Sequence, residues 1–514
     1  MNLLFSDIRS ASPGSYAAVC RVISVRKAKI GQFLTLNDGT ADQVFLIFQN
    51  SGLPLADLAP DEVVSIDFRI ERQASRDNFP ILKSVKRFEG IDRQNALDII
   101  LSNSSAMFTP LSPDFLVSSP VLDRLRDKFS SAASLILKSV SENRKIIIRH
   151  HGDNDGYCAA FALEKVIIPM IKKAHPSHAF RYYKRSACRT PFLDYSDATR
   201  ELSYATDDMA FGAKEPLLIV VDNGSSSEDV LSLRKLRISG FRLIVVDHHF
   251  PADLQRKNRV IIDDLVDVHI NPHLAGGSND LTAGMLCAEL SRFIDPEARE
   301  QEVLAAMSGI TDKSSGQEQQ SYLDLCRRIG YDYDFLADLS MCVDFEAFFS
   351  RSFDARGFID VLLGLDREKK GEIIRMLIPE ILSAHVMRVK VLSENMEKKI
   401  WGGNALCTID LDRTLPNNSY PASGKSVGLL FDSLKGSHDI LVVLGLRSDG
   451  ITFRMTRMER FNLNIFIEEL TERFPYSNIE GGGHENAGSI RFIPADRDRI
   501  ADFVLERMEA LLNA

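Results

Sequence analysis

The chain has 514 residues, of which 45% are hydrophobic and 26% are charged, as in an ordinary soluble globular protein. This length is too great for one hydrophobic core, so we expect about two to four domains. The formal net charge of −9 argues against a strongly basic nucleic-acid binder, although a groove can be locally basic on an acidic protein.

The sequence carries no sign of export or of membrane insertion. Its start, MNLLFSDIRSASPG, has no basic segment followed by a long apolar run, so we expect no signal peptide. No run of about 18 uncharged apolar residues occurs, so no membrane span or membrane contact is predicted. The seven cysteines are scattered and form no CxxC pair, which argues against a disulfide framework and a zinc knuckle. A cytoplasmic location is the expectation.

The first segment, residues 1–92, has the pattern of a small β-barrel. Residues 13–92 contain short alternating apolar runs with turn signals between them. About five short strands in so few residues predict a barrel of the oligonucleotide/oligosaccharide-binding (OB) type. The aromatic residues Phe33, Phe45 and Phe48 could stack on bases or could fill the core of the barrel.

The middle of the chain is predicted to contain a parallel β-sheet. After a linker and an amphipathic helix in residues 93–143, apolar runs alternate with helical patterns over residues 144–318. The chain has three such runs that end in ionisable residues, KIIIRHH, EPLLIVVDNG and FRLIVVDHHF. Continuous apolar strands that alternate with helices indicate a parallel sheet covered on both faces. The functional groups of such a sheet gather beyond the carboxyl ends of its strands.

The remaining segments complete an α/β protein. Residues 319–400 have a helical pattern and are predicted to connect two domains. Residues 401–514 return to mixed strands and helices, as in a second, smaller α/β domain, and a cleft between the two α/β domains is expected. Within the central domain, the segment RYYKRSACR (181–189) combines four Lys/Arg with two Tyr. It either guides phosphates or forms a solvated loop or strand edge.

One short stretch, IRHHGDNDGY at 148–157, places His151, Asp153 and Asp155 at alternating positions where an apolar run ends. Residues two apart in an extended segment share a face, so these three side chains could converge on one point. They would repel one another and be costly to desolvate unless a cation lay among them, and a divalent metal is the obvious candidate. Further candidates follow later in the chain. They are Asp222, Asp247, His248, His249 and Asp312.

Five motifs that contain these and other candidates follow one another along the chain. They are HGDNDG (151–156), VVDNG (220–224), VVDHH (245–249), GITD (309–312) and GGGHENAG (481–488). In this order they resemble the motifs of the DHH phosphoesterase family, and in particular its RecJ-like exonuclease branch, in the archaeal type with an N-terminal OB-fold. The resemblance implies a parallel-sheet DHH catalytic domain at 144–318, a helical connector, and a DHH-associated substrate-binding domain at 401–514.

The resemblance implies a centre with two divalent metal ions, usually manganese, with magnesium as the alternative. Carried over position by position, the ligands would be His151 and Asp153 on one ion, Asp155, His248 and Asp312 on the other, and Asp222 as a bridge between the ions. The chemistry agrees, because carboxylate and imidazole ligands without cysteine suit these metals.

The resemblance also implies residues that handle the substrate. Asp247 would orient a histidine and His249 would face the substrate phosphate, so that both join Asp222 as catalytic residues. The implied substrate-binding residues are His484, Gly482, Gly483 and Arg454. Glycines permit close approach of the backbone to a phosphate. Arg454 stands where the family often has a phosphate-binding arginine, although Met455 replaces the common serine.

We therefore predict a metal-dependent exonuclease that hydrolyses single-stranded DNA or RNA by a two-metal mechanism, with the barrel guiding the strand toward the cleft. Two alternatives stay open. One is a small-substrate phosphodiesterase that acts on oligoribonucleotides or cyclic dinucleotides, and the other is a non-catalytic replication or repair scaffold, against which the complete ligand set argues. Expected partners are single-stranded nucleic acid and replication or repair proteins. Thr282 and its neighbouring glycines could offer backbone amides to a phosphate or form a structural turn.

Overall fold

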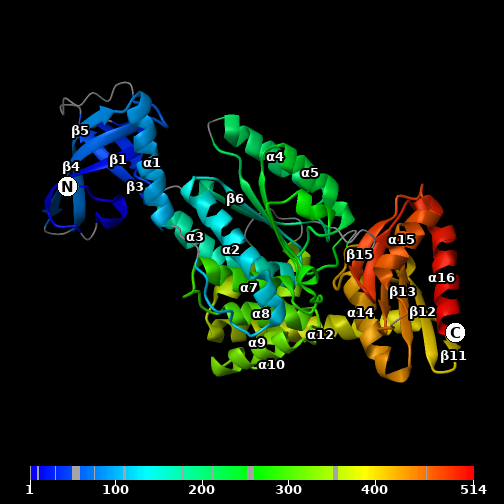
Figure 1. Cartoon of the computed structure of the whole chain (residues 1–514). Coiled ribbons are helices and arrows are strands. Elements are labelled where there is room, and N and C mark those ends of the chain that lie inside the picture. The colour runs from blue at the N-terminus through cyan, green and yellow to red at the C-terminus, as the bar shows by residue number, and fades with distance from the viewer. Residues whose placement is uncertain are drawn as a thin grey trace.

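The structure, a computed structural model, describes residues 2–8, 11–28, 31–48, 58–73, 76–107, 111–174, 179–188, 190–210, 213–251, 254, 260–350, 357–458 and 460–513. These residues form three β-sheets that follow one another along the chain (Figure 1). The N-terminal sheet lies on one side of the central domain and the C-terminal sheet on the other. Among the described helices, none has both the length and the apolar character needed to cross a membrane.

The N-terminal sheet is antiparallel and closes on itself. Its strands are β1 (Gly14–Ala28), β2 (Gly31–Asn37), β3 (Asp42–Phe48), β4 (Val63–Gln73) and β5 (Arg76–Arg87). Their order is β3-β2-β1-β4-β5, and β3 also contacts β5, which gives the small barrel that the sequence predicts. The rings of Phe45 and Phe68 pack inside it, 5.8 Å apart, whereas Phe33 is 37% exposed. Phe45 is therefore a core residue, and the side chain of Phe48 lies outside the described part.

Two helices connect the barrel to the central domain, where the sequence predicted a linker and one helix. They are α1 (Gly90–Met107) and α2 (Pro120–Ser141). The apolar residues of α1 face in different directions. Ala96 and Ile100 are buried against Val63 of the barrel, whereas Ile91 and Ile99 are exposed. Because α1 has no single apolar face, the periodicity of the sequence did not indicate a helix there.

The central sheet is parallel, with the strand order β10-β9-β8-β6-β7. Its strands are β6 (Ile146–His150), β7 (Tyr183–Ala187), β8 (Leu217–Val221), β9 (Arg242–Val246) and β10 (Val268–Ile270). The helices on its faces are α2, α3 (Asn154–Ala174) and α7 (Ala283–Ile294) on one side, and α4 (Tyr195–Ala210) and α5 (Val230–Ile238) on the other. Ile146 and Ile148 pack toward the first group and Ile147 toward the second. Because both faces are covered, the strands are continuous apolar runs.

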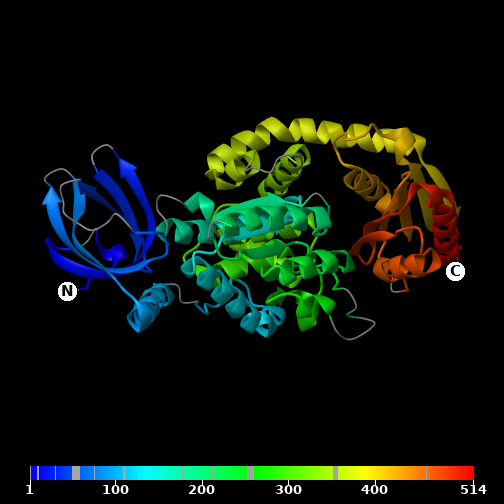
Figure 2. The same cartoon turned by 90° about the horizontal axis from the view of Figure 1, so that it is seen from above.

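Five helices extend the central domain and lead to the third sheet. They are α8 (Gln301–Thr311), α9 (Gln317–Arg328), α10 (Tyr333–Ser350), α11 (Phe358–Gly364) and α12 (Arg367–Asn395). Asp366 caps α12, because its side chain accepts a hydrogen bond from the backbone N–H of Lys369. Figure 2 shows α12 running as one long helix from the central domain to the C-terminal domain.

The C-terminal sheet is mixed. Its strands are β11 (Glu397–Trp401), β12 (Asn404–Asp410), β13 (Leu441–Leu446), β14 (Gly450–Met455), β15 (Glu480–His484) and β16 (Ala487–Arg491), in the order β11-β12-β13-β14-β16-β15. Strands β12 and β13 are parallel and the other neighbours are antiparallel. Helix α14 (Ser423–Leu434) covers one face, and α15 (Leu463–Arg473) and α16 (Arg497–Asn513) cover the other. This sheet is the second α/β unit of the predicted fold.

The barrel meets the central domain at the amino ends of the parallel strands. Tyr182 directly precedes β7, and Lys214 lies just before β8. Burial raises the pKa of the Tyr182 phenol and lowers that of the Lys214 ammonium group. On the barrel, the charge of Asp61 adds to the first shift and the charge of Arg21 adds to the second. The predicted metal ligands follow the carboxyl ends of the same strands. The barrel and these ligands therefore lie at opposite ends of the central sheet.

Candidate metal centre

Neighbouring strands of the central sheet bring the predicted metal ligands together. β6, β8 and β9 lie side by side, and their carboxyl ends therefore meet at one edge. Two groups of potential ligand atoms lie there, each with its atoms within 4.8 Å of one another. The first group is His151, Asp153 and Asp222, and the second is Asp155, His248 and Asp312. All six residues that the sequence predicts as ligands are thus in one place, and a third group adds His249 to Asp222 and His248.

Asp222 lies between the two groups. Its Oδ2 is 3.5 Å from Nδ1 of His151, which in turn lies 2.9 Å from Oδ2 of Asp153. Its Oδ1 is 3.4 Å from Nε2 of His248. The same Nε2 lies 3.5 Å from Oδ2 of Asp155 and 3.3 Å from Oδ2 of Asp312. One carboxylate oxygen of Asp222 therefore faces each group, which is the arrangement of a ligand shared by two cations.

The chain turns sharply after β8 to hold Asp222 in this position. Its backbone φ is +57°, in the left-handed region, which aspartate adopts more readily than most residues because its short polar side chain can bond locally. Gly224 follows with φ of +105°, and a Cβ atom there would lie 2.9 Å from Cγ1 of Val245. The turn therefore needs a glycine at 224 to pass close to β9.

The hydrogen bonds of His248 fix its tautomer. Its Nδ1 lies 2.9 Å from the backbone oxygen of Asn279, which can only accept, so Nδ1 carries the hydrogen and Nε2 presents its lone pair to the acids. In the described part of the chain, neither Nε2 of His248 nor Oδ2 of Asp222 has a hydrogen-bond partner, although both are buried. Unpartnered buried acceptors are costly, and a cation among them satisfies both. These residues therefore fit divalent metal ions, and oxygen and imidazole donors suit manganese or magnesium.

Asp155 is anchored at the N-terminus of α7. Its Oδ2 accepts a hydrogen bond of 3.0 Å from the N–H of Ala283, and its Oδ1 accepts one of 2.6 Å from the N–H of Gly284 and one of 2.5 Å from the hydroxyl of Ser308. The sequence suggested that the amides after Thr282 could bind a substrate phosphate. That suggestion is wrong, because a carboxylate of the protein uses these amides itself.

Asp247 orients His249 from a buried position. Its Oδ1 lies 2.8 Å from Nδ1 of His249 and also accepts hydrogen bonds from the backbone N–H groups of His248 and His249. Burial alone would raise the pKa of Asp247, but His249 and these bonds hold it well below its usual range. Burial would likewise lower the pKa of His249, and the charge of Asp247 raises it above its ordinary value. Asp247 therefore acts on the site through His249.

Sequence reasoning missed a hydrogen-bonded line that supports Asp247. The Ser225 hydroxyl lies 3.0 Å from Nε2 of His269, and Nδ1 of His269 lies 2.7 Å from Oδ1 of Asp263. The order is that of a nucleophilic triad, but Ser225 is fully buried, so its hydroxyl cannot meet a substrate. Instead, the backbone N–H of Ser225 donates to Oδ2 of Asp247 at 3.0 Å. The line therefore stabilises the turn that positions Asp247.

The C-terminal domain contributes His484 to the edge of the metal centre. Its ring lies 5.7 Å from that of His249, nearly parallel to it, and 5.7 Å from that of His248. Nδ1 of His484 lies 2.5 Å from Nδ2 of Asn279. Burial lowers the pKa of His484 to about 3, and the neighbouring histidines act in the same direction, so the ring is neutral. The structure thus places this predicted substrate contact opposite His249.

The other predicted substrate contacts are Gly482 and Gly483, which precede His484 on β15, and Arg454 on β14. Gly483 has a φ of +143°, and a Cβ there would lie 2.6 Å from Cα of Gly488 on the neighbouring strand, whereas the space beside Gly482 is open. Arg454 on β14 donates from Nη1 to its neighbour's backbone oxygen, that of Phe453, at 2.7 Å. Burial lowers the pKa of Arg454 from its usual value, and its charge lies close enough to act on His484.

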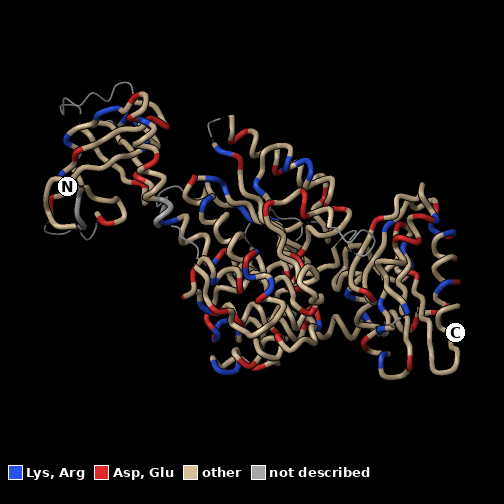
Figure 3. The backbone as a smooth tube through the Cα atoms, in the orientation of Figure 1, with Lys and Arg blue, Asp and Glu red and all other residues tan. Residues whose placement is uncertain are grey.

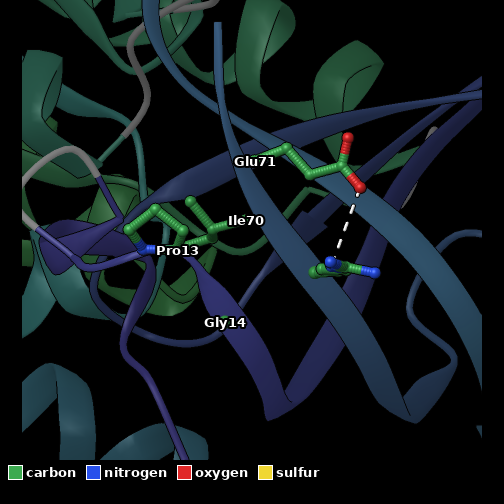
Figure 4. A pocket seen from close by; sticks show the side chains of 5 residues that line it. Pro13, Gly14, Ile70 and Glu71 are labelled. Atoms are coloured by element: carbon green, nitrogen blue, oxygen red, sulfur yellow. Dashed lines mark ion pairs between the residues drawn. The ribbon is translucent and has the colours of Figure 1, made fainter.

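Two other features of the molecule do not form part of this centre. In the segment 181–189, Lys184 pairs with Glu201 at 2.8 Å and Arg185 pairs with Asp360, so these cations are neutralised by acids and the strand-edge interpretation is favoured. A hollow of about 370 Å³ on the barrel is lined by Pro13, Gly14, Arg69, Ile70 and Glu71. Glu71, labelled in Figure 4, forms an ion pair of 3.6 Å with Arg69.

The crowding of acids predicts how the stability of the metal-free protein depends on pH. Burial raises the pKa of Asp312 to about 7, and the charges of Asp153 and Asp222 add to the rise against that of His248. In the unfolded chain this carboxyl titrates near about 4. Between about pH 4 and about pH 7 the folded state therefore binds more protons at this group. The contribution of Asp312 to the free energy of unfolding falls as pH rises through this interval.

We expect the opposite trend with metal. Urea unfolding in EDTA should show wild type losing stability relative to Asp312→Asn as pH rises from 4 to 7. Adding Mn²⁺ should stabilise wild type increasingly over the same interval, because the metal binds the carboxylate form. Parallel pH profiles of the two proteins in EDTA would contradict the burial of an acid at position 312.

A parallel sheet with acids and histidines gathered at the carboxyl ends of its strands is the arrangement of a phosphoesterase domain. Residues 145–310 match the family model described as the DHH family, N-terminal domain. A solved structure described as the DHH domain of a member of a family of ribosomal proteins is 31% identical, with a TM-score of 0.76, over 81% of this chain and 98% of that one. The chain therefore belongs to the DHH family of phosphoesterases.

Two further proteins are similar to the chain. An uncharacterized protein of Methanocaldococcus jannaschii is 31% identical over 501 residues, which cover 92% of this chain. The chain spans 66% of the length of that relative. RecJ from Thermus thermophilus, solved in complex with Mn²⁺, is 16% identical, with a TM-score of 0.49, over 78% of this chain and 58% of that one.

Proposed function

We propose that the chain is a metal-dependent phosphodiesterase, and that it acts as a RecJ-like exonuclease on single-stranded DNA or RNA. One observation carries the proposal: the two oxygens of Asp222 face two separate groups of ligands. Two divalent ions about 4 Å apart suit hydrolysis of a phosphodiester. We take Mn²⁺ as the preferred ion and Mg²⁺ as the alternative.

The residues of the chain have distinct tasks in this proposal. His151 and Asp153 would hold one ion, Asp155, His248 and Asp312 the other, and Asp222 both. Such ions, when bound, would activate a water for attack on phosphorus and neutralise charge on the phosphate. Asp247 keeps His249 protonated at Nδ1, which leaves Nε2 of His249 for a phosphate oxygen. His484 would hold the phosphate from the side of the C-terminal domain.

The barrel supports a polymeric substrate, because small barrels of this type bind oligonucleotides. Figure 3 shows Lys/Arg and Asp/Glu interspersed over the barrel, so its charge does not by itself identify nucleic acid. Its position at the amino ends of the central strands also favours a second candidate, a phosphodiesterase for small substrates that need only the metal centre. The complete ligand set weighs against a scaffold without activity, although binding to replication or repair proteins could accompany catalysis.

Digestion of matched substrates by the full chain tests these candidates. Single-stranded DNA and RNA labelled at either end, a linear dinucleotide and a cyclic dinucleotide are incubated with Mn²⁺, and again with EDTA. We expect mononucleotides or short oligomers from at least one polymer with Mn²⁺ and none with EDTA. Hydrolysis of a dinucleotide alone would assign the chain to small substrates. If none of the four substrates is hydrolysed, the non-catalytic scaffold is the remaining candidate.

A further inference from the structure

Asn279, in the segment between β10 and α7, lies between two histidines that come from different domains. Its backbone oxygen is 2.9 Å from Nδ1 of His248 in the central domain. Its side-chain nitrogen Nδ2 is 2.5 Å from Nδ1 of His484 in the C-terminal domain. A single residue thus touches a predicted metal ligand and a predicted phosphate contact.

The two bonds of Asn279 have opposite chemical sense. A backbone carbonyl can only accept, so Nδ1 of His248 must carry the hydrogen. An amide NH₂ can only donate, so Nδ1 of His484 must present its lone pair, and the single hydrogen of the neutral ring must be on Nε2. Asn279 therefore gives the two histidines opposite tautomers. His248 keeps a lone pair on Nε2 for a cation, and His484 keeps an N–H on Nε2 for an anion.

We propose that Asn279 is a positioning residue that holds His484 in the tautomer whose Nε2–H donates to the phosphate of the substrate. Its backbone oxygen holds His248 in the tautomer that can bind the metal. One residue therefore orients a metal ligand in the central domain and a phosphate contact in the C-terminal domain. The inference rests on the proposed function in one respect, namely that the ligand in the cleft carries a phosphate.

Other contacts hold the two domains together independently of Asn279. Lys313 on the central domain pairs with Asp432 at 2.6 Å, and Lys425 of α14 pairs with Asp344 of α10 at 3.2 Å. The backbone N–H of Gly481 donates to the Glu228 side chain at 3.1 Å. Loss of the bond between Asn279 and His484 should therefore change the tautomer of His484 without separating the domains.

Asn279→Asp tests the assignment, because aspartate has almost the shape of asparagine but no donor. The backbone oxygen that binds His248 is unchanged. The new carboxylate can only accept, so Nδ1 of His484 must now carry the hydrogen, and in the neutral ring Nε2 turns a lone pair toward the phosphate. We expect the affinity for inorganic phosphate, measured calorimetrically with Mg²⁺ present, to fall about tenfold or more, because a made bond becomes a repulsive contact. Mn²⁺ affinity should stay within about twofold of wild type.

Nitrogen NMR of ¹⁵N-histidine-labelled, metal-free protein gives a readout that does not depend on activity. The signals of His484 are assigned by their loss in His484→Gln. We expect the protonated nitrogen of His484 to change from Nε2 to Nδ1 in Asn279→Asp, while His248 keeps its pattern. Asn462→Asp is the matched control, because Asn462 caps α15 by accepting hydrogen bonds, as aspartate also does.

Two outcomes would overturn the proposal. Unchanged NMR signals and unchanged phosphate affinity in Asn279→Asp would mean that the amide oxygen, and not its nitrogen, faces His484. An equal loss of Mn²⁺ affinity would mean that Asn279 acts through His248 alone. If Asn279→Asp does not fold, Asn279→Ala removes the donor without adding an acceptor, and weaker phosphate binding is expected there too. A wild-type chain that hydrolyses no phosphodiester would refute the proposed function, while the NMR result would still decide the role of Asn279.

Discussion

Asp222→Asn is expected to lower phosphodiester hydrolysis by about a thousandfold or more and to reduce the number of Mn²⁺ ions bound per chain from two to one. Asp222 presents one carboxylate oxygen to each of the two groups described above. Asparagine tolerates the left-handed backbone of +57° at this position, so the turn should remain intact. Calorimetric titration with Mn²⁺ and a labelled-strand assay measure the two effects.

The matched control for this variant is Asp498→Asn, which removes an acid whose side chain is 89% exposed on α16. It should leave metal stoichiometry and turnover unchanged. In EDTA, Asp222→Asn should be at least as stable as wild type, because it removes one of several crowded negative charges. Full turnover or unchanged stoichiometry in Asp222→Asn would show that the centre does not use a shared carboxylate.

Gly156→Ala is expected to cost about 1–3 kcal/mol of stability and to weaken Mn²⁺ binding more than tenfold. Gly156 lies in the first turn of α3, directly against the backbone of His151. An added Cβ would lie 2.9 Å from the carbonyl carbon of His151 and 3.0 Å from its nitrogen, and still closer to its carbonyl oxygen. Because the clashing atoms belong to the backbone, relief requires a shift of His151 and of the predicted metal ligands that follow it. Urea unfolding and metal titration measure the two losses.

Gly152→Ala provides a control within the same motif. A Cβ at position 152 would lie 3.4 Å from the backbone oxygen of Cys188, which is an ordinary contact distance. We expect this variant to keep near wild-type stability and metal affinity. Equal effects of the two alanines would show that the motif is sensitive to any side chain, and that the close approach of α3 to His151 is not the cause.

The place where the proposed metal ligands gather could be predicted from the sequence because a simple rule gives it. β6, β8 and β9 are short strands, parallel and adjacent, so residues within two positions of their carboxyl ends, such as Asp222 and His248, must meet at one edge. The contact of Asp247 with a histidine could be predicted for a similar reason, since Asp247 is next to the histidines in the sequence. In both cases the sequence alone shows which residues lie close together, either because they are adjacent in the chain or because they follow adjacent parallel strands.

The residues that sequence reasoning missed depend on packing between distant segments. Asn279 contacts His484 across 205 positions of sequence, and Ser225 contacts His269 across 44, so no local pattern indicates either bond. Whether the amides after Thr282 bind a phosphate or belong to a structural turn stayed open, because nothing in the sequence shows that Asp155 reaches them. Helix α1 was missed because its apolar residues do not share one face. The position of the barrel could not be predicted either, since the contacts that dock one domain on another leave no periodic signal.

The position of the barrel has a consequence for how long a substrate must be. The charges of Arg21 and Asp61 act on Tyr182 and Lys214, which precede β7 and β8, whereas Asp222 follows the last residue of β8. β8 has five residues, so the two places are separated by at least about 16 Å of strand. A nucleic acid gripped by both must be several nucleotides long. Under the proposed exonuclease function, a strand shortened below that length would lose its contact with the barrel. Digestion would then slow and leave end products whose length is set by the distance between the barrel and the metal centre.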